Sequence, residues 1–488
     1  MRVMHLGWGF RHWRVGGLIA YAEDLMTSQA AAGHQVSYFF QGRHYPLRGP
    51  RLKRWERDGV AMYELQNAPH RQGGDRGTIF PELDLHDPVT ESAFTAVLEE
   101  VRPDVLHFQE LGGLPSSLIE IARAHAVPTV MSLEDYAPLC PTVKLFDVDG
   151  MNCRRQLPGE QCVRCCAHAP VHDRHLILQT ALYHGVPGGA RGLVRLGDAV
   201  SGLRRRSKLA RAALGRVHRE TAPREHVEPA RAPTPPAEYD HRRKVNAARL
   251  SAVDLVLAMS TRVEEIYREL GVNPKRMRTL QFTLRHLERL RPGERVEAGR
   301  PLRLVTLNGC ASEEKGARVV VEALDLLAER GLAADVRLDV LGSVAPAYAP
   351  LLEAHENVAI CGHYTPEELD VLLDEFDVGI VPSVWEEAYG YTGIELLAKG
   401  IPVVGNRLGG LTDYVVENRT GWLTDEPSGA GLTRVLEQLV ADPSRVTELR
   451  RSLRRARDEI IKPMDVHLRE IEEAYAEVVR PLTAAAGA

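Results

Sequence analysis

Glu387 and Glu395 stand eight positions apart, on either side of the turn 389–392 (YGYT). The run Asp377 to Val381 (DVGIV) predicts a strand before this turn, and a helix is predicted to begin near Gly393. In parallel α/β sheets, ligands bind beyond the carboxyl ends of the strands, where loops meet helix N-termini. Ionised carboxylates accept hydrogen bonds, and neighbouring sugar hydroxyls donate them. The spacing therefore predicts two glutamates facing a polyol, although an acid in a first helical turn can also simply complement the helix dipole.

Five of the seven cysteines form a second group with chemical potential, because they lie between residues 140 and 166. Their spacing is C-x12-C-x8-C-x2-C, with a fifth cysteine adjacent. Four thiolates suit a tetrahedral structural zinc, and Cys-x2-Cys is a typical half-site. An iron–sulfur cluster fits the same count, and free or disulfide-forming thiols are the alternative without a metal. The predicted ligands are Cys140, Cys153, Cys162 and Cys165, with Cys166 as an alternative and His168 and His172 as spare ligands.

Two series of short apolar strands and amphipathic helices alternate along the chain, which predicts two parallel sheets covered on both faces. The first series predicts strands over 2–6, 35–40, 60–64, 104–108, 129–132 and 255–259, and helices over 18–31, 89–101, 115–125 and 261–270. The second predicts strands over 302–307, 335–341, 357–361, 377–381 and 401–404, and helices over 317–330, 366–375 and 464–479.

Length and composition favour an ordinary protein of two domains. The chain has 488 residues, which is too many for one core. Charged residues make up 26% and the formal net charge is -5, which argues against a general nucleic-acid binder. We see no basic start followed by an apolar segment, and no apolar run of about 20 residues. The expectation is a cytoplasmic protein whose cysteines are free or metal-bound rather than paired in disulfides.

The stretch 384–423 resembles the donor-binding signature of the family 4 glycosyltransferases, a large retaining group with the GT-B fold. The matching features are two glutamates with seven residues between them, a G-x-P-V-V strand, a Gly-Gly turn and a later Thr-Gly. The family usually has Pro-Phe-Gly after the first glutamate, whereas this chain has Ala388-Tyr389-Gly390 and so keeps the aromatic residue and the glycine that lets backbone approach a ligand. These features are Glu387, Glu395, residues 400–404, Gly409-Gly410 and Thr420-Gly421.

The resemblance covers nearly the whole chain and implies an α/β fold of the GT-B type. Such a fold has two Rossmann-like domains facing across a cleft, with a C-terminal helix returning to the N-terminal domain. Some family members carry a similar Cys-rich insertion, so the resemblance extends to that subgroup. The implied divisions are an acceptor-side domain 1–286 with a Cys-rich loop 140–166 and a basic, Pro-rich insertion 203–246, a linker 287–301, a nucleotide-sugar domain 302–462, and a crossover helix and tail 463–488.

The same resemblance assigns the charges of a donor site. Glu387 would hold donor-sugar hydroxyls and Glu395 the ribose. Lys315 matches the family's diphosphate lysine, a flexible point charge suited to phosphate. Cys310 replaces the usual arginine, so one of two expected cations is missing unless Arg318, Arg407 or a metal compensates. The family pattern implies no catalytic divalent cation.

Backbone groups complete the implied donor site. Gly16 and Gly17 follow the first strand and precede a helix, so their amides are expected to face a diphosphate, although glycine pairs before helices are common for structural reasons. The loops after the strands near 341 and 361 would present backbone to the nucleobase. The full donor-binding set is Gly16, Gly17, Gly309, Lys315, Ser343, His363, Glu387, Tyr389, Gly390, Tyr391, Thr392 and Glu395.

The acceptor side offers two more candidate residues. The family often has a His-Asp pair after the strand that here reads TVMSLED, and Glu134 stands in place of the histidine, followed by Asp135. Glu134 is predicted to contact the sugar or to act as a base toward the acceptor, against the alternative of a loop acid without a chemical role. His107 ends the strand DVLHF and is either catalytic or structural. With Glu387 and Lys315, these residues form the predicted catalytic set.

The middle of the chain is predicted to be irregular. Residues 203–224 carry eight Lys or Arg and one acid, and a Pro-rich stretch (APTPPAEY) follows. Such a basic piece can lie on an anionic membrane or grip a phosphorylated acceptor. It can equally be a solvated insertion.

The resemblance implies a retaining enzyme that moves a hexose-type sugar from a nucleotide-diphosphate sugar to an acceptor hydroxyl. Polysaccharide, lipid-linked and small-metabolite acceptors all remain open, as does the base of the donor. Two alternatives remain, and the replacements at Cys310 and Glu134 make the first of them plausible. One is a non-catalytic GT-B-like protein that binds sugar nucleotides, and the other is a GT-B sugar-nucleotide epimerase.

Overall fold

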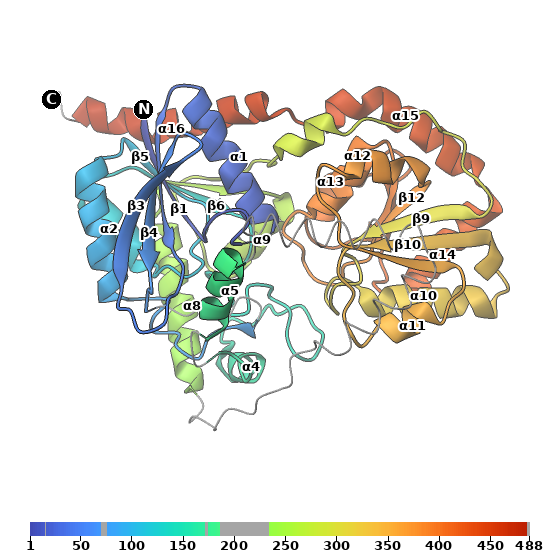
Figure 1. Cartoon of the computed structure of the whole chain (residues 1–488), viewed down its shortest axis with the longest axis horizontal. Helices are drawn as coiled ribbons and strands as arrows, with labels where there is room; N and C mark the ends of the chain where they lie inside the picture. Colours follow the sequence, from blue (N-terminus) through green and yellow to red (C-terminus); the bar gives the residue numbers. More distant parts are fainter. Residues whose placement is uncertain (15, 70–75, 171–173, 186–233, 486–488) are drawn as a thin grey trace.

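The computed structural model describes residues 1–14, 16–69, 76–170, 174–185 and 234–485. Two α/β domains lie side by side, each built around its own sheet, as Figure 1 shows. Every strand pairing in both sheets is parallel except that of β3 with β4. This is the two-domain arrangement predicted from the alternating strands and helices.

The N-terminal sheet has eight strands in the order β3-β4-β2-β1-β5-β6-β7-β8. Its central strands are buried on both faces, which explains their nearly continuous apolar sequences. The edge strand β3 pairs antiparallel with β4 and is only partly buried. The strands are β1 (Arg2–Gly7), β2 (Gln35–Gln41), β3 (Arg51–Arg57), β4 (Val60–Gln66), β5 (Val105–Phe108), β6 (Thr129–Leu133), β7 (Leu255–Ala258) and β8 (Met277–Thr279).

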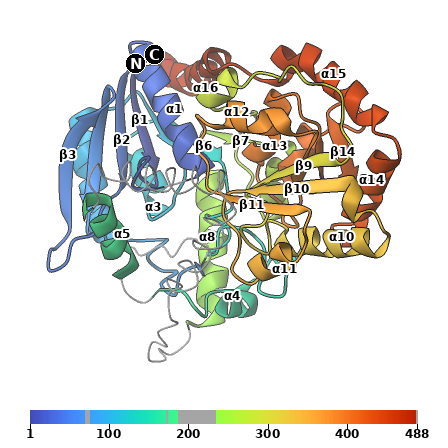
Figure 2. The same ribbon diagram turned by 45° about the vertical axis from the view of Figure 1, so that its right-hand side comes forward.

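Helices cover both faces of this sheet, and local sequence fixes where several begin. Asp87 caps α2 by accepting a hydrogen bond from the Val89 amide, with Pro88 in the first turn. The side chain of Ser260 caps α9 in the same way. In Figure 2, α8 runs alongside α4 below the sheet. The helices are α1 (Gly17–Ala31), α2 (Pro88–Val101), α3 (Ser117–Ala124), α4 (Gly159–Cys165), α5 (Arg174–Gly185), α8 (Pro236–Ser251) and α9 (Thr261–Glu269).

The C-terminal sheet has six parallel strands in the order β11-β10-β9-β12-β13-β14. The strands are β9 (Leu302–Leu307), β10 (Val336–Leu341), β11 (Val358–Gly362), β12 (Val378–Val381), β13 (Val403–Asn406) and β14 (Gly421–Thr424). The helices around it are α10 (Ala317–Glu329), α11 (Ala349–Glu353), α12 (Leu369–Leu372), α13 (Tyr391–Ala398), α14 (Gly429–Ala441) and α15 (Ser444–Ile460).

The last helix, α16 (Met464–Ala485), crosses back to the N-terminal domain and lies along α1 (Figure 1). Its contacts are buried hydrogen bonds: the Tyr21 hydroxyl lies 2.9 Å from His467 Nε2, and Gln29 donates to the Tyr475 hydroxyl at 3.1 Å. The predicted return of the C-terminal helix is therefore confirmed. The linker that crosses in the other direction contains the short helix η2 (Arg285–Arg289).

Three predicted features differ from the structure. The helix expected over 366–375 is only the short α12 followed by the single 3₁₀ turn η4 (Leu373–Glu375). Strands β3, β8 and β14 were not expected; β3 reads RLKRWER, whose charges hide an edge strand. The end of the predicted irregular stretch 203–246 is helical, because α8 begins at Pro236 with proline in its first turn. Residues 203–233 of that stretch lie outside the described residues. No helix in the described parts of the chain is long and apolar enough to span a bilayer.

Candidate donor site at the domain boundary

Glu387 and Lys315 form an ion pair in the C-terminal domain. Glu387 lies in the loop between β12 and α13, and Lys315 lies just before α10. The Ser383 hydroxyl donates a hydrogen bond of 2.6 Å to the second carboxylate oxygen of Glu387. The ammonium of Lys315 also lies 5.4 Å from the centre of the Trp385 ring. The structure thus brings together the two charges that the sequence assigned to sugar and diphosphate, with Glu387 largely buried and Lys315 one-third exposed.

Glu395 lies on α13, and its carboxylate forms a hydrogen bond with a histidine that the sequence did not indicate. His286 Nε2, from η2 in the linker, is 2.8 Å from Glu395 Oε1, and both side chains are buried. Gly390 precedes α13 with a φ of 79°, a conformation that favours glycine. The Tyr414 hydroxyl donates to the Gly390 carbonyl at 2.7 Å and so holds this turn. Tyr389 packs against Tyr391 and Tyr414 edge to face, and Thr392 lies in the first turn of α13.

The glycine turn of the N-terminal domain touches the donor loop of the other domain. Gly17 begins α1, and a Cβ atom built on it would lie 2.7 Å from the Tyr391 ring. Only glycine lets these two segments approach so closely. Gly16 has a φ of 141° and open space where a Cβ would be. This contact places the Gly16-Gly17 turn beside the donor loop; that the two form one binding site stays a prediction.

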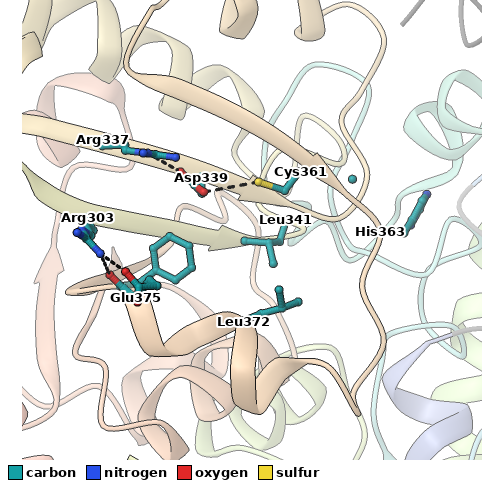
Figure 3. Close-up of a pocket in the computed structure, with 10 residues that line it drawn as sticks. Arg303, Arg337, Asp339, Leu341, Cys361, His363, Leu372 and Glu375 are labelled. Carbon is teal, nitrogen blue, oxygen red and sulfur yellow. Dashed lines mark hydrogen bonds and ion pairs between the residues drawn. The ribbon is translucent and has the colours of Figure 1, made fainter. Parts of the chain in front are cut away.

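A cavity of about 340 Å³ is lined by residues of β9, β10 and β11, by His363 and by residues of the segment 372–376 (Figure 3). Asn308 Oδ1 accepts a hydrogen bond of 3.2 Å from the Ser343 amide, and its amide group donates to Tyr364. Gly309 follows Asn308 and packs against Pro382. His363 lies at one end of the cavity, which continues along the sheet to ion pairs of Arg337 with Asp339 and of Arg303 with Glu375 (Figure 3).

Cys310, which stands in place of the family's arginine, is fully buried, and burial raises the pKa of its thiol to about 12. A neutral thiol supplies no positive charge. The two arginines considered as substitutes are paired elsewhere. Arg318 contacts Glu313 and Glu322 along α10, and Arg407 contacts Asp425. Lys315 is therefore the cation that the described structure places against the donor glutamate.

Glu134 is buried at the carboxyl end of β6, and neither of its carboxylate oxygens has a hydrogen-bond partner in the described part of the chain. Burial raises its pKa well above the usual value, and the nearby acids Glu110 and Asp135 raise it further. Burial also raises the pKa of Asp135, to about 6, even though its carboxylate accepts a hydrogen bond from the Ala137 amide. Glu134 acts electrostatically on Tyr391, so it lies near the donor loop.

His107 is fully buried inside the N-terminal domain. One ring nitrogen lies 2.7 Å from the Tyr475 hydroxyl of α16, and the other lies 2.9 Å from the Ser132 hydroxyl. Burial lowers its pKa well below the usual value. These contacts attach the returning helix to the sheet.

Most cysteines of the Cys-rich loop are buried, and α4, which carries Cys162 and Cys165, packs against α8. The described residues contain no group of three or more His, Cys, Asp or Glu side chains placed to hold a metal. Cys162 and Cys166 instead pack with Ala169 and Tyr239 as small apolar side chains. Burial raises the pKa of the Cys165 thiol to about 11 and that of Cys166 to about 12. His172 lies outside the described residues.

Four polar residues at the domain boundary were not indicated by sequence reasoning. Glu386 binds Arg154 and Arg262 from the N-terminal domain, and His286 reaches Glu395. The position of Glu386 directly before Glu387 was the one available signal. Residues from distant parts of the chain form the other halves of these pairs, so no local pattern marks them.

Two family models match the chain, and between them they cover both domains. The model described as "Glycosyl transferases group 1" matches residues 302–459, and "Glycosyl transferase 4-like domain" matches residues 16–169. Among curated proteins, the chain is 32% identical over 163 residues to D-inositol 3-phosphate glycosyltransferase of Arthrobacter sp. (strain FB24). It is 30% identical over 171 residues to the putative colanic acid biosynthesis glycosyltransferase WcaL of Escherichia coli (strain K12). These matches cover 32% and 33% of this chain and span only 38% and 41% of those proteins.

Solved structures show the same fold over nearly the full length. Sucrose-phosphate synthase from Thermosynechococcus elongatus aligns with a TM-score of 0.61 and 16% identity, covering 99% of this chain and all of that chain. Anabaena HepE in complex with UDP and glucose aligns with a TM-score of 0.57 and 10% identity, covering 98% and 99%. The fold is GT-B, and the chain belongs to the family 4 glycosyltransferases.

Proposed function

We propose that this protein is a retaining glycosyltransferase that moves a hexose-type sugar from a nucleotide-diphosphate sugar to an acceptor hydroxyl. The observation that carries the proposal is the Lys315–Glu387 pair, which lies in the donor loop region next to the inter-domain contact of Gly17 with Tyr391. Glu387 offers acceptor oxygens for sugar hydroxyls, while Lys315 neutralises charge on the departing diphosphate. Turnover requires that both groups contact one bound donor.

We propose a uridine nucleotide as the first donor to test, because Anabaena HepE, which shares this fold, has been crystallised with UDP, with UDP and glucose, and with UDP-glucose. Glu395 would accept hydrogen bonds from the ribose hydroxyls. The Gly16-Gly17 turn would direct amides at the diphosphate, and the cavity beside His363 is our candidate for the site of the base, with Ser343 in the loop after β10.

On the acceptor side, we propose that Glu134 contacts the reacting hydroxyl or the donor sugar. An unpartnered buried carboxyl is costly, so a ligand hydroxyl that pairs with it gains affinity. His107 is better explained as a structural residue, because its two ring nitrogens already contact α16 and β6. A carbohydrate, lipid-linked or small-metabolite acceptor would fit this chemistry.

The proposed function predicts that one nucleotide diphosphate stabilises the protein against heat, and that Glu395→Ala weakens the effect. A ligand at one hundred times its dissociation constant adds about 2.7 kcal/mol to the free energy of unfolding. The measurement is the melting temperature of each protein with UDP, GDP, ADP and the corresponding glucose and mannose nucleotides. Glu353→Ala, at an exposed site on α11, is the matched control. If no nucleotide shifts the wild-type melting temperature, the donor site is wrong.

A structural metal in the Cys-rich loop remains a proposal that rests on the cysteine spacing, since the thiols as placed do not form a site. If a metal is present, purified protein should contain about one zinc, or a cluster's iron, per chain. Cys162→Ser with Cys165→Ser should then abolish the metal content and lower the melting temperature. Metal analysis by mass spectrometry checks this. A metal-free wild-type protein whose stability survives both substitutions contradicts the proposal.

A further inference from the structure

Glu386 is the meeting point of the two domains beside the donor site. Its carboxylate pairs with Arg154 of the Cys-rich loop at 2.6 Å and with Arg262 of α9 at 2.9 Å. The other carboxylate oxygen accepts a hydrogen bond of 2.8 Å from the amide of Gly409. Burial opposes ionisation of Glu386, but the Arg262 and Gly409 hydrogen bonds outweigh it and lower the pKa of this carboxyl. Glu386 is therefore ionised and fully paired at neutral pH.

Asn152 of the Cys-rich loop binds the backbone of the same segment. Its side-chain oxygen accepts from the Glu386 amide at 3.1 Å, and its side-chain nitrogen donates to the Val384 carbonyl at 3.2 Å. A single amide side chain thus holds both polar groups of the backbone. The backbone next to Glu387 is therefore hydrogen-bonded to the opposite domain through the side chain of Asn152.

A second bridge reaches the segment that carries Lys315. Lys144 of the Cys-rich loop forms an ion pair with Glu314, the residue before Lys315. The Glu314 carbonyl in turn accepts a hydrogen bond of 3.0 Å from the Val384 amide. Burial opposes ionisation of Glu314, and Lys144 lowers its pKa below the usual value. Each charged residue of the donor site, Glu387 and Lys315, therefore directly follows a glutamate that forms an ion pair with the Cys-rich loop.

We infer that Lys144, Asn152 and Arg154 are positioning residues, which hold Glu387 and Lys315 in register for the donor from the opposite domain. The inference rests on the proposed function and assigns the Cys-rich loop a part in it. Glu387 and Lys315 pair directly, while their neighbours Glu386 and Glu314 are each fixed by a cation from one loop. Without these two cations the segments keep the packing of their own domain, and Glu386 keeps its pair with Arg262, but Glu386 loses one of its two cations and Glu314 loses its ion pair with Lys144. Glu387 and Lys315 would then occupy more than one arrangement. The apparent dissociation constant of the donor would rise in inverse proportion to the fraction of molecules in the binding arrangement.

The test compares Arg154→Gln with Arg155→Gln in the full chain. Arg155 lies in the same loop, but its guanidinium pairs with Asp147 of that loop at 2.8 Å and contacts nothing described in the C-terminal domain. Two quantities are measured: amide hydrogen exchange over residues 383–393 in the unliganded protein, and the dissociation constant of UDP by calorimetry. The double variant Lys144→Gln with Arg154→Gln removes both ion pairs made by the Cys-rich loop and leaves the Arg262 pair of Glu386 in place, while Arg154→Lys restores a charge at the same position.

We expect exchange over 383–393 to rise about tenfold in Arg154→Gln and further in the double variant, since an ion pair to a buried carboxylate is lost. The UDP dissociation constant should rise by about five- to tenfold, with Arg154→Lys in between and Arg155→Gln unchanged. Exchange and affinity equal to those of the Arg155 control in the double variant would overturn the inference. If the wild type does not bind UDP, the uridine donor fails, but the exchange comparison still decides whether these residues order the loop.

Discussion

Replacing Lys315 by methionine is expected to lower turnover by about 10²- to 10³-fold, the usual loss when one group that stabilises transition-state charge is removed. The reason is that none of the three described residues considered as a second cation supplies one: the Cys310 thiol is neutral, and Arg318 and Arg407 pair with other acids. Methionine retains most of the apolar stem of lysine but not the ammonium, so the substitution also removes the charge that lies 5.4 Å from the centre of the Trp385 ring. The measurement is the steady-state release of nucleotide diphosphate from the donor identified by thermal stabilisation.

Arg318→Met is the control for this result. Arg318 lies three positions further on, at the start of α10, and its ion pairs are half-exposed and therefore contribute little. Its turnover should stay within about twofold of wild type. If Arg318→Met fell as far as Lys315→Met, the guanidinium would be the missing diphosphate cation. If neither variant lost activity, the assignment of Lys315 to the diphosphate would be wrong.

Glu134→Gln is expected to lower turnover by about 10²- to 10⁴-fold, because glutamine cannot take up a proton. Burial raises the pKa of the wild-type carboxyl well above its usual value, so at a given pH less of it is in the basic form than for an exposed glutamate. Its basic form therefore grows as the pH rises, and the wild-type rate should rise with it. Glu110 and Asp135 also have raised pKa values and contribute to the profile. The residual rate of Glu134→Gln should therefore rise less steeply with pH than the wild-type rate. A rate within twofold of wild type would leave Glu134 as a buried loop acid.

The same substitution should make the protein more stable, which separates a chemical role from a folding defect. A carboxyl whose folded pKa is raised binds a proton more tightly in the native state than in the unfolded state. Its contribution to the free energy of unfolding is therefore largest below the unfolded pKa and falls as the pH rises toward the folded pKa. Glutamine has no such dependence. The gap in melting temperature between Glu134→Gln and wild type should widen from pH 5 to pH 8, with Glu160→Gln on the surface of α4 as the control.

The fold was largely predictable because it depends on the spacing of apolar residues and on the glycines that mark turns. Buried parallel strands such as β5 and β12 are continuous apolar runs, and Gly17 and Gly390 mark turns that require glycine. The pairing of Lys315 with Glu387 could also be expected, since both follow strands of one sheet. The sequence was silent on Arg154, Arg262 and His286, because their partners lie more than one hundred residues away. The cysteine spacing predicted a metal site that the described residues do not form, because spacing alone does not fix where the thiols point.

The return of α16 has a mechanical consequence. The chain passes between the domains twice on the same side of the molecule, once through η2 and once just before α16 (Figure 1). Two neighbouring crossings would act as a hinge, which favours relative rotation of the domains about an axis through both crossings. The Cys-rich loop and α4 lie on the far side from those crossings (Figure 1). Rotation about such an axis would displace the Cys-rich loop more than residues near the crossings, so the ion pairs of Lys144 and Arg154 with the opposite domain would be among the contacts most affected as the domains move apart.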